Sequence, residues 1–283
     1  MWPAEFDYAR PSSVAEALQL LADNEDAKLL AGGHSLLPAM KLRLNEAPLL
    51  IDISRIEGLG SISNNGSLTI GALCTHADIA ASADVQASCN ALATATGMVG
   101  DQQVRNWGTL GGNVAHADPA SDPPTVLVAF NANINIEGAS GSRSVAAADF
   151  FMDLFTVDLE PGEIITSIEI PAHAHDGCAY VKMPHPASRY AVVGICVVLH
   201  RDGDTCSGAH VGVGGATVRA MRSPGAEAAL RGSALDDAAL DAAEAALKDD
   251  IANDLIGDMS FPEAYRQEMA GVYLKRAVRA AGG

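Results

Sequence analysis

Two short glycine-rich segments carry the residue types that can bind an anion through the protein backbone. The first is Ala31-Gly32-Gly33-His34-Ser35, and the second is Gly108-Thr109-Leu110-Gly111-Gly112-Asn113. Glycine lacks a Cβ and tolerates positive φ, so backbone N–H groups in such segments can close around a bulky anion. Two of these segments in one chain predict two walls around a phosphate-bearing ligand, and they favour a dinucleotide over a single phosphate.

Neither segment matches the common nucleotide-binding motifs. No Gly-Lys-Ser/Thr follows either segment, which excludes a P-loop, and neither fits the G-x-G-x-x-G pattern of a Rossmann site. We therefore predict a dinucleotide held between two lobes, with its diphosphate facing the backbone N–H groups of Gly32, Gly33, Gly111 and Gly112. A helix that begins near Ser35 would favour an anion at its N-terminus, and Thr109 and Asn113 would add side-chain donors. The alternative is that each glycine pair only makes a tight turn.

Histidine and aspartate side chains offer two other kinds of chemistry. His34, His76 and His116 are far apart and lack the spacing of a zinc site, so we predict no metal centre. Asp118 and Asp122 could form an acid–base pair, or they could be a turn carboxylate and a helix N-cap. The sequence leaves these two interpretations open, and we assign no catalytic residue.

The elements that must position these residues alternate between strand and helix. Strands are predicted at 28–31 and 49–53 with a helix over 35–44 between them, an order that resembles an α/β unit. Composition changes around 171–177, which predicts a domain boundary, and a helical region over 224–280 follows an antiparallel meander. The remaining predicted helices are 13–22, 84–99 and 122–130, the remaining strands before the boundary are 67–72, 133–137 and 164–170, and the meander strands are 179–183, 190–200, 207–213 and 216–221.

Composition limits the class of partner. The 283 residues are 48% hydrophobic, which is enough for one large domain or two ordinary ones. The net charge of −17 argues against binding nucleic acid or an anionic membrane through a broad basic face. No segment approaches the roughly 20 apolar residues of a spanning helix, and the first residues lack a signal-peptide pattern. The five cysteines form no C-x-x-C pair, so we expect a cytoplasmic protein whose own chain holds no zinc or iron–sulfur cluster.

Taken together, the motifs resemble those of the FAD-binding medium subunits of molybdenum hydroxylases, the family of the carbon monoxide dehydrogenase medium subunit and the xanthine dehydrogenase FAD domain. The resemblance rests on residues 31–38, 108–113 and 118–122, and it extends from Phe6 to the helix at 265–271. It implies an α+β fold. A two-lobed PCMH-type, vanillyl-alcohol-oxidase-like FAD-binding domain is expected over residues 1–172, with lobes of about 1–55 and 56–172. A small antiparallel sheet with a helical bundle is expected over 178–283.

The resemblance also implies which residues contact the cofactor, which we expect to be noncovalent FAD. Both glycine segments would hold the diphosphate, and Asn113 and Asp122 would contact the cofactor. Lys182 and Tyr190 fall where the family places residues near the isoalloxazine, although Tyr190 by itself could also be a core aromatic. The full expected set is Ala31, Gly32, Gly33, His34, Ser35, Leu36, Gly108, Thr109, Gly111, Gly112, Asn113, Asp122, Lys182 and Tyr190.

The same resemblance implies electron transfer within an assembly. A large subunit with a molybdenum cofactor would oxidise the substrate, and a small subunit with [2Fe–2S] clusters would pass the electrons to this chain. This chain would deliver them to an external acceptor, in an assembly expected to be a dimer of heterotrimers. One alternative is a self-contained FAD-dependent oxidase or dehydrogenase of the same fold, and another is a scaffold or nucleotide sensor. The sequence leaves the substrate and the electron acceptor open.

Overall fold

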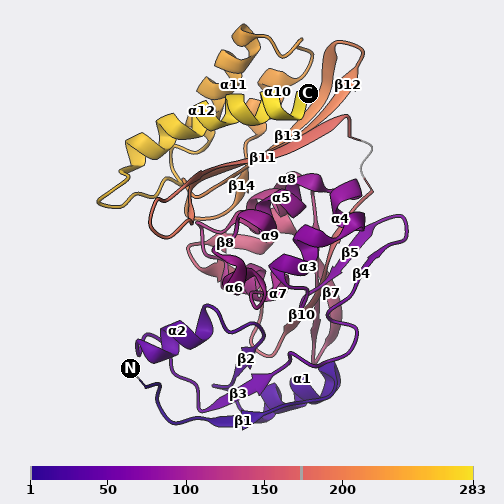
Figure 1. The fold of residues 1–283 in the computed structure, drawn as a ribbon, viewed down its shortest axis with the longest axis vertical. Helices are drawn as coiled ribbons and strands as arrows, with labels where there is room; N and C mark the ends of the chain where they lie inside the picture. The colour runs from indigo at the N-terminus through magenta and orange to yellow at the C-terminus, as the bar shows by residue number, and fades with distance from the viewer. Residues whose placement is uncertain (1, 173–174, 283) are drawn as a thin grey trace.

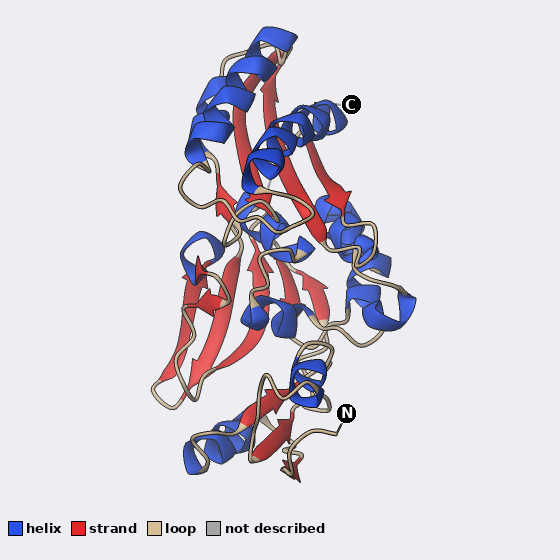
Figure 2. Ribbon diagram, turned by 90° about the vertical axis from the view of Figure 1, so that its left-hand side faces the viewer, coloured by secondary structure: helices blue, strands red, loops and turns tan. Residues whose placement is uncertain are grey.

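A computed structural model describes residues 2–172 and 175–282, and Figures 1 and 2 show its sheets stacked along the long axis with helices packed against them. The sheet nearest the N-terminus is parallel, with strand order β1-β3-β2. Its elements are β1 (Asp7–Ala9), α1 (Val14–Asp23), β2 (Lys28–Leu30), α2 (Leu36–Lys41) and β3 (Leu49–Asp52). The predicted α/β unit is therefore confirmed, although α2 ends earlier than expected because Arg43 adopts a φ of 60°.

The middle sheet is antiparallel and has the strand order β4-β5-β10-β6-β7. Ile134 and Ile136 of β6 alternate with half-buried residues and point into the core, as the sequence pattern predicts. Its strands are β4 (Ile62–Asn64), β5 (Leu68–Gly71), β6 (Asn133–Gly138), β7 (Gly141–Ala146) and β10 (Ile164–Ile170), and a small hairpin pairs β8 (Phe151–Asp153) with β9 (Thr156–Val157). The helices of this region are α3 (His76–Ala81), α4 (Ala83–Ser88), α5 (Asn90–Met98), α6 (Gln102–Arg105), α7 (Leu110–His116), α8 (Asp122–Ala129) and α9 (Ala147–Phe150).

One expectation about this region is wrong, and the second glycine segment is partly helical. The single helix predicted over 84–99 is interrupted at Cys89, which is fully buried and leaves the helical conformation with φ −151° and ψ 65°. The break allows α5 to turn its alanine-rich face into the core. The second glycine segment is not a loop throughout, because α7 starts at Leu110 and includes Gly111, Gly112 and Asn113.

The third sheet is an antiparallel meander in the order β11-β12-β13-β14, as predicted. Every residue of β12 from Ala191 to Leu199 is buried, because α5 and α8 contact one side of the sheet and the C-terminal helices pack against it as well. The last strand is shorter than expected and covers only Met221–Arg222. The elements are β11 (Gly177–Pro184), β12 (Ala191–Asp202), β13 (Thr205–Gly214), β14 (Met221–Arg222), α10 (Pro224–Leu230), α11 (Asp237–Asp250) and α12 (Glu263–Gly282).

The predicted domain boundary around 171–177 lies between the middle sheet and the third sheet, and residues 173–174 of it lie outside the described residues. The two chain ends lie at opposite parts of the molecule, the N-terminus beside the first sheet and the C-terminus beside α11 and α12 (Figure 1). Among the helices of the described residues, none is long and apolar enough to cross a bilayer.

Candidate functional site

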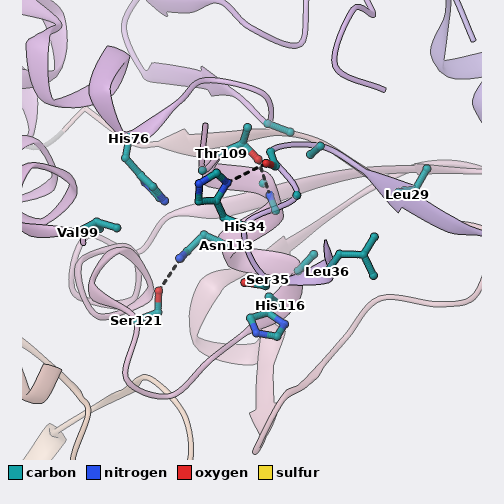
Figure 3. Close-up of a pocket in the computed structure, with 18 of the residues that line it drawn as sticks. Leu29, His34, Ser35, Leu36, His76, Val99, Thr109, Asn113, His116 and Ser121 are labelled. Carbon is teal, nitrogen blue, oxygen red and sulfur yellow. Dashed lines mark hydrogen bonds between the residues drawn. The ribbon is translucent and has the colours of Figure 1, made fainter. Parts of the chain in front are cut away.

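A cavity of about 410 Å³ brings together residues from all three sheet regions. Its walls come from the loop between β2 and α2, the turn into α7, the start of α8 and the β11–β12 turn, and Figure 3 shows part of this lining. All the expected cofactor-binding residues line it except Lys182. The structure therefore brings nearly all of the expected residues to one cavity, although they span about 160 positions between Ala31 and Tyr190.

The first glycine loop lines this cavity and has backbone donors that no described residue accepts. Within the described residues, no hydrogen bond uses the backbone N–H of Gly32, Gly33, His34 or Ser35 as its donor. Gly33 has a φ of 72°, which a residue with a Cβ rarely adopts. Ser35 begins α2, but its hydroxyl makes no capping bond. The loop is therefore a cluster of free N–H groups at a site where an anion can accept them.

Gly32 is also required for packing between the two glycine segments. A Cβ at this position would lie 1.9 Å from the carbonyl oxygen of Trp107, which directly precedes the second segment. Substitution of Gly32 therefore forces the two backbones apart and disturbs the fold together with any ligand site.

Most backbone N–H groups of the second segment already donate to other groups of the protein. Thr109 is the N-cap of α7 and accepts the N–H of Gly112 at 3.2 Å. The N–H of Gly111 donates to the carbonyl of Ala72 at 2.8 Å. The prediction that the Gly111 N–H faces a diphosphate is therefore wrong, since that donor is already engaged. This segment supplies a close-packed wall, and the free backbone donors lie opposite it on the first loop.

The polar end of the cavity is organised by side chains. Ser121 donates to Oδ1 of Asn113 at 2.8 Å, a bond drawn in Figure 3, which leaves the amide nitrogen of Asn113 without a partner among the described residues. Tyr190 lines the cavity with 48% of its surface exposed, so it is not the core aromatic of the alternative interpretation. Burial of part of the ring, with the nearby Asp118 and Asp122 carboxylates, raises the pKa of Tyr190.

Asp122 lies at the boundary between the cavity and the third sheet. Lys182 Nζ donates to Asp122 Oδ2 at 2.8 Å, and Tyr180 Oη donates to Oδ1 at 2.6 Å. Lys182 is not among the residues that line the cavity and is a buried partner of Asp122, so its expected position near the isoalloxazine stays a prediction. Burial raises the pKa of Asp122, against the lowering effect of the lysine and the tyrosine.

The alternative that Asp118 and Asp122 form an acid–base pair finds no support in these contacts. Asp118 Oδ1 accepts the backbone N–H of Ala120 at 2.9 Å, which makes it a turn carboxylate. Both carboxylate oxygens of Asp122 are engaged by β11 side chains, and Ser121 takes the N-cap position of α8.

The opposite end of the cavity is apolar, and the sequence reasoning missed it. Leu29 comes from β2 and Ile53 directly follows β3, and both belong to one hydrophobic cluster with Ile164 at the start of β10. The missed apolar lining residues include Leu29, Ile53, Leu159, Ile164 and Ile165. Their signal was weak, because strand-end aliphatic residues are also typical of an ordinary core.

The lining fits an elongated dinucleotide such as FAD. It offers apolar walls for a flat base at one end, free N–H groups beside the middle, and polar side chains with an exposed tyrosine at the other. Among the described residues that line the cavity, Arg189 is the sole Lys or Arg, so a diphosphate there would depend on N–H donors. The described residues contain no cluster of three or more His, Cys, Asp or Glu side chains that could hold a metal ion.

Comparison with known proteins identifies two family domains in this chain. Residues 4–173 match the family model for the FAD binding domain in molybdopterin dehydrogenase, and residues 178–281 match the CO dehydrogenase flavoprotein C-terminal domain. The carbon monoxide dehydrogenase medium chain of Hydrogenophaga pseudoflava is 41% identical, over 99% of this chain and 98% of that protein.

Solved structures give the same answer. Reconstituted CO dehydrogenase from Oligotropha carboxidovorans superimposes with a TM-score of 0.95 at 37% identity, covering 99% of both chains. Quinoline 2-oxidoreductase from Pseudomonas putida 86 gives a TM-score of 0.94 at 31% identity, covering 99% of this chain and 98% of that one. The predicted family and α+β fold are thus confirmed, and the chain belongs to the family of FAD-binding medium subunits of molybdenum hydroxylases.

Proposed function

We propose that this chain is the FAD-carrying electron-transfer subunit of a molybdenum hydroxylase. The observation that carries the proposal is a cavity lined both by the first glycine loop, whose backbone N–H groups have no partner among the described residues, and by the tightly packed second segment. Bound FAD supplies redox chemistry that can join one-electron carriers to a two-electron acceptor. The residues of this chain bind and orient the cofactor, and the Asp118 and Asp122 carboxylates are engaged in other contacts rather than arranged as an acid–base pair.

The proposal extends to the assembly. Electrons come from the [2Fe–2S] clusters of a small subunit after a large molybdenum-cofactor subunit oxidises the substrate, and the complex is a dimer of heterotrimers in the cytoplasm. Substrate choice belongs to the large subunit, as relatives named for carbon monoxide and for quinoline share this fold. The FAD is noncovalent, and the cofactor domain spans 1–172 and the C-terminal domain 178–283.

Anaerobic reduction of the purified complex tests the proposed function. Addition of the substrate of the large subunit should bleach the visible flavin absorbance of the complex. The isolated chain, loaded with FAD, should not be reduced by the same substrate. Reduction of the flavin in the isolated chain would contradict an electron-transfer role and would support a self-contained dehydrogenase.

Ser35→Asp separates cofactor binding from folding. Aspartate is a good N-cap, so the substitution should leave α2 intact or slightly more stable. Its carboxylate would repel a diphosphate on the adjacent N–H groups and should weaken FAD binding about tenfold or more, which is 1.4 kcal/mol per tenfold change. The measurement is titration of the deflavinated chain with FAD, followed by flavin fluorescence.

Ser13→Asp is the matched control for that experiment. Ser13 is also an N-cap serine, at the start of α1, and it does not line the cavity. It should leave FAD affinity unchanged. Equal affinities for Ser35→Asp and Ser13→Asp would show that the diphosphate does not bind at the first glycine loop.

A further inference from the structure

His76 is a buried polar side chain in the cavity wall whose imidazole lacks a complete set of partners. The residue is 3% exposed, and its Nδ1 has no hydrogen-bond partner among the described residues. The ring lines the cavity and points into it in Figure 3. Buried side-chain polar atoms are nearly always paired, so an unpaired imidazole at a ligand cavity calls for an explanation.

The backbone around His76 holds the ring in this position. Thr75 and Asp78 form a capping box at the start of α3, with Asp78 N–H donating to Thr75 Oγ1 at 3.1 Å. The N–H of His76 donates to the carbonyl of Gly108 at 2.9 Å. The ring lies so close to Gly108 that a Cβ there would be 2.9 Å from Cδ2 of His76. The imidazole is thus clamped between α3 and the second glycine segment.

His76 is neutral at physiological pH. Burial, with smaller electrostatic contributions from His34 and Arg105, lowers its pKa to about 4. A neutral imidazole has one N–H donor and one bare nitrogen. Nδ1 is enclosed without a partner, so the proton belongs on Nε2, the ring nitrogen left to interact with the cavity.

We propose that His76 is a neutral hydrogen-bond donor to bound FAD, with its Nε2–H directed to a diphosphate oxygen. The proposal rests on the proposed function, because it requires FAD in this cavity. His76 contacts the second glycine segment through Gly108, and His34 of the first loop is near enough to influence it electrostatically. It therefore lies where the two segments meet. Arg189 is the sole Lys or Arg among the described residues that line this cavity. A fixed N–H donor of this kind therefore contributes to holding an anion there.

Three substitutions of His76 distinguish a donor from a packing residue. Glutamine can place its amide nitrogen near the position of Nε2, whereas asparagine reaches only the position of Nδ1. His76→Leu and His76→Asn should weaken FAD binding about tenfold or more, and His76→Gln should remain within about threefold of wild type. The measurement is FAD titration of the deflavinated full chain, with urea unfolding of the same samples without FAD.

The stability measurement separates binding from structure. Leucine removes an unsatisfied buried polar atom, so the FAD-free His76→Leu chain should be at least as stable as wild type. His200→Leu is the control, because His200 lies on β12 and is not among the residues that line the cavity, and it should not change FAD affinity. Wild-type affinity in His76→Leu, or a loss of FAD-free stability that matches the loss of affinity, would overturn the proposal. A wild-type chain that binds no FAD would instead overturn the proposed function, and the role of His76 would fall with it.

Discussion

Replacement of Lys182 by methionine should destabilise the protein by about 3–5 kcal/mol, because it leaves the Asp122 carboxylate buried without its counter-ion. The side chains of Lys182 and Asp122 are only 3% and 5% exposed, and their charged atoms are 2.8 Å apart. Burial already raises the pKa of Asp122 in the presence of the lysine. Urea unfolding of the full chain measures the loss. Lys41→Met, at an exposed position, is the control and should change stability by only a few tenths of a kcal/mol.

The pH dependence of this loss identifies its cause. Without the ammonium group, the pKa of Asp122 in the folded state rises further above its unfolded value of about 3.9. The folded variant then holds a proton that the unfolded chain has released, so its stability falls as pH rises through this window. The deficit relative to wild type should therefore be larger near pH 8 than near pH 5.

A second substitution should rescue the variant. In Asp122→Asn/Lys182→Met no buried charge remains, and the asparagine can still accept the hydroxyl of Tyr180. Most of the lost stability should return, since removing both members of a buried pair costs far less than removing one. A deficit that is equal at both pH values and unchanged in the double variant would show that Lys182 acts by packing alone.

The parts of the site that the sequence predicted depend on local signals. The free N–H groups of the first loop follow from Gly32-Gly33 placed between a short apolar strand and a helix, and all of these lie within about ten residues. Gly33 could be predicted as a turn residue from the sequence, because glycine alone adopts a positive φ readily and this does not depend on distant contacts. The resemblance to a family then added Asp122 and Tyr190, which no local pattern distinguishes from a turn residue and a core aromatic.

The parts that the sequence could not predict depend on contacts between distant residues. Lys182 and Asp122 are 60 positions apart, and only the packing of α8 against the third sheet brings them together as a pair. Gly111 looks like a ligand-binding glycine, yet its N–H is engaged by Ala72, which lies in another part of the middle region. His76 attracted attention only as a possible metal ligand, because its burial and its contact with Gly108 arise from tertiary structure.

Arg266→Met should cost about 3 kcal/mol or more of stability, because it removes a buried charged donor shared by several backbone carbonyls. The residue is 7% exposed on α12, and its Nη1 donates to the carbonyls of Gly215 at 2.6 Å and Val192 at 3.2 Å. Its Nε donates to the carbonyl of Phe261 at 3.1 Å. Arg266→Lys should recover only part of the loss, since one ammonium group cannot reproduce the forked geometry. Arg276→Met on the same helix is the control, because Arg276 is exposed and stacks only on Tyr273.

The same substitution should also weaken FAD binding, although Arg266 does not line the cavity. Arg266 holds the end of β13 and the start of β12 through the carbonyls of Gly215 and Val192. These strand ends in turn donate to the turn before α8. The Gly215 N–H donates to the carbonyl of Pro119 at 2.8 Å, and the Ala191 N–H donates to the carbonyl of Ala120 at 3.1 Å. Tyr190 directly precedes Ala191, so loosening this junction should displace the polar end of the cavity. Urea unfolding and FAD titration of the folded variant should both show losses, whereas Arg276→Met should show neither. Reduced stability with unchanged FAD affinity would mean that the third sheet supports the fold without positioning the cofactor.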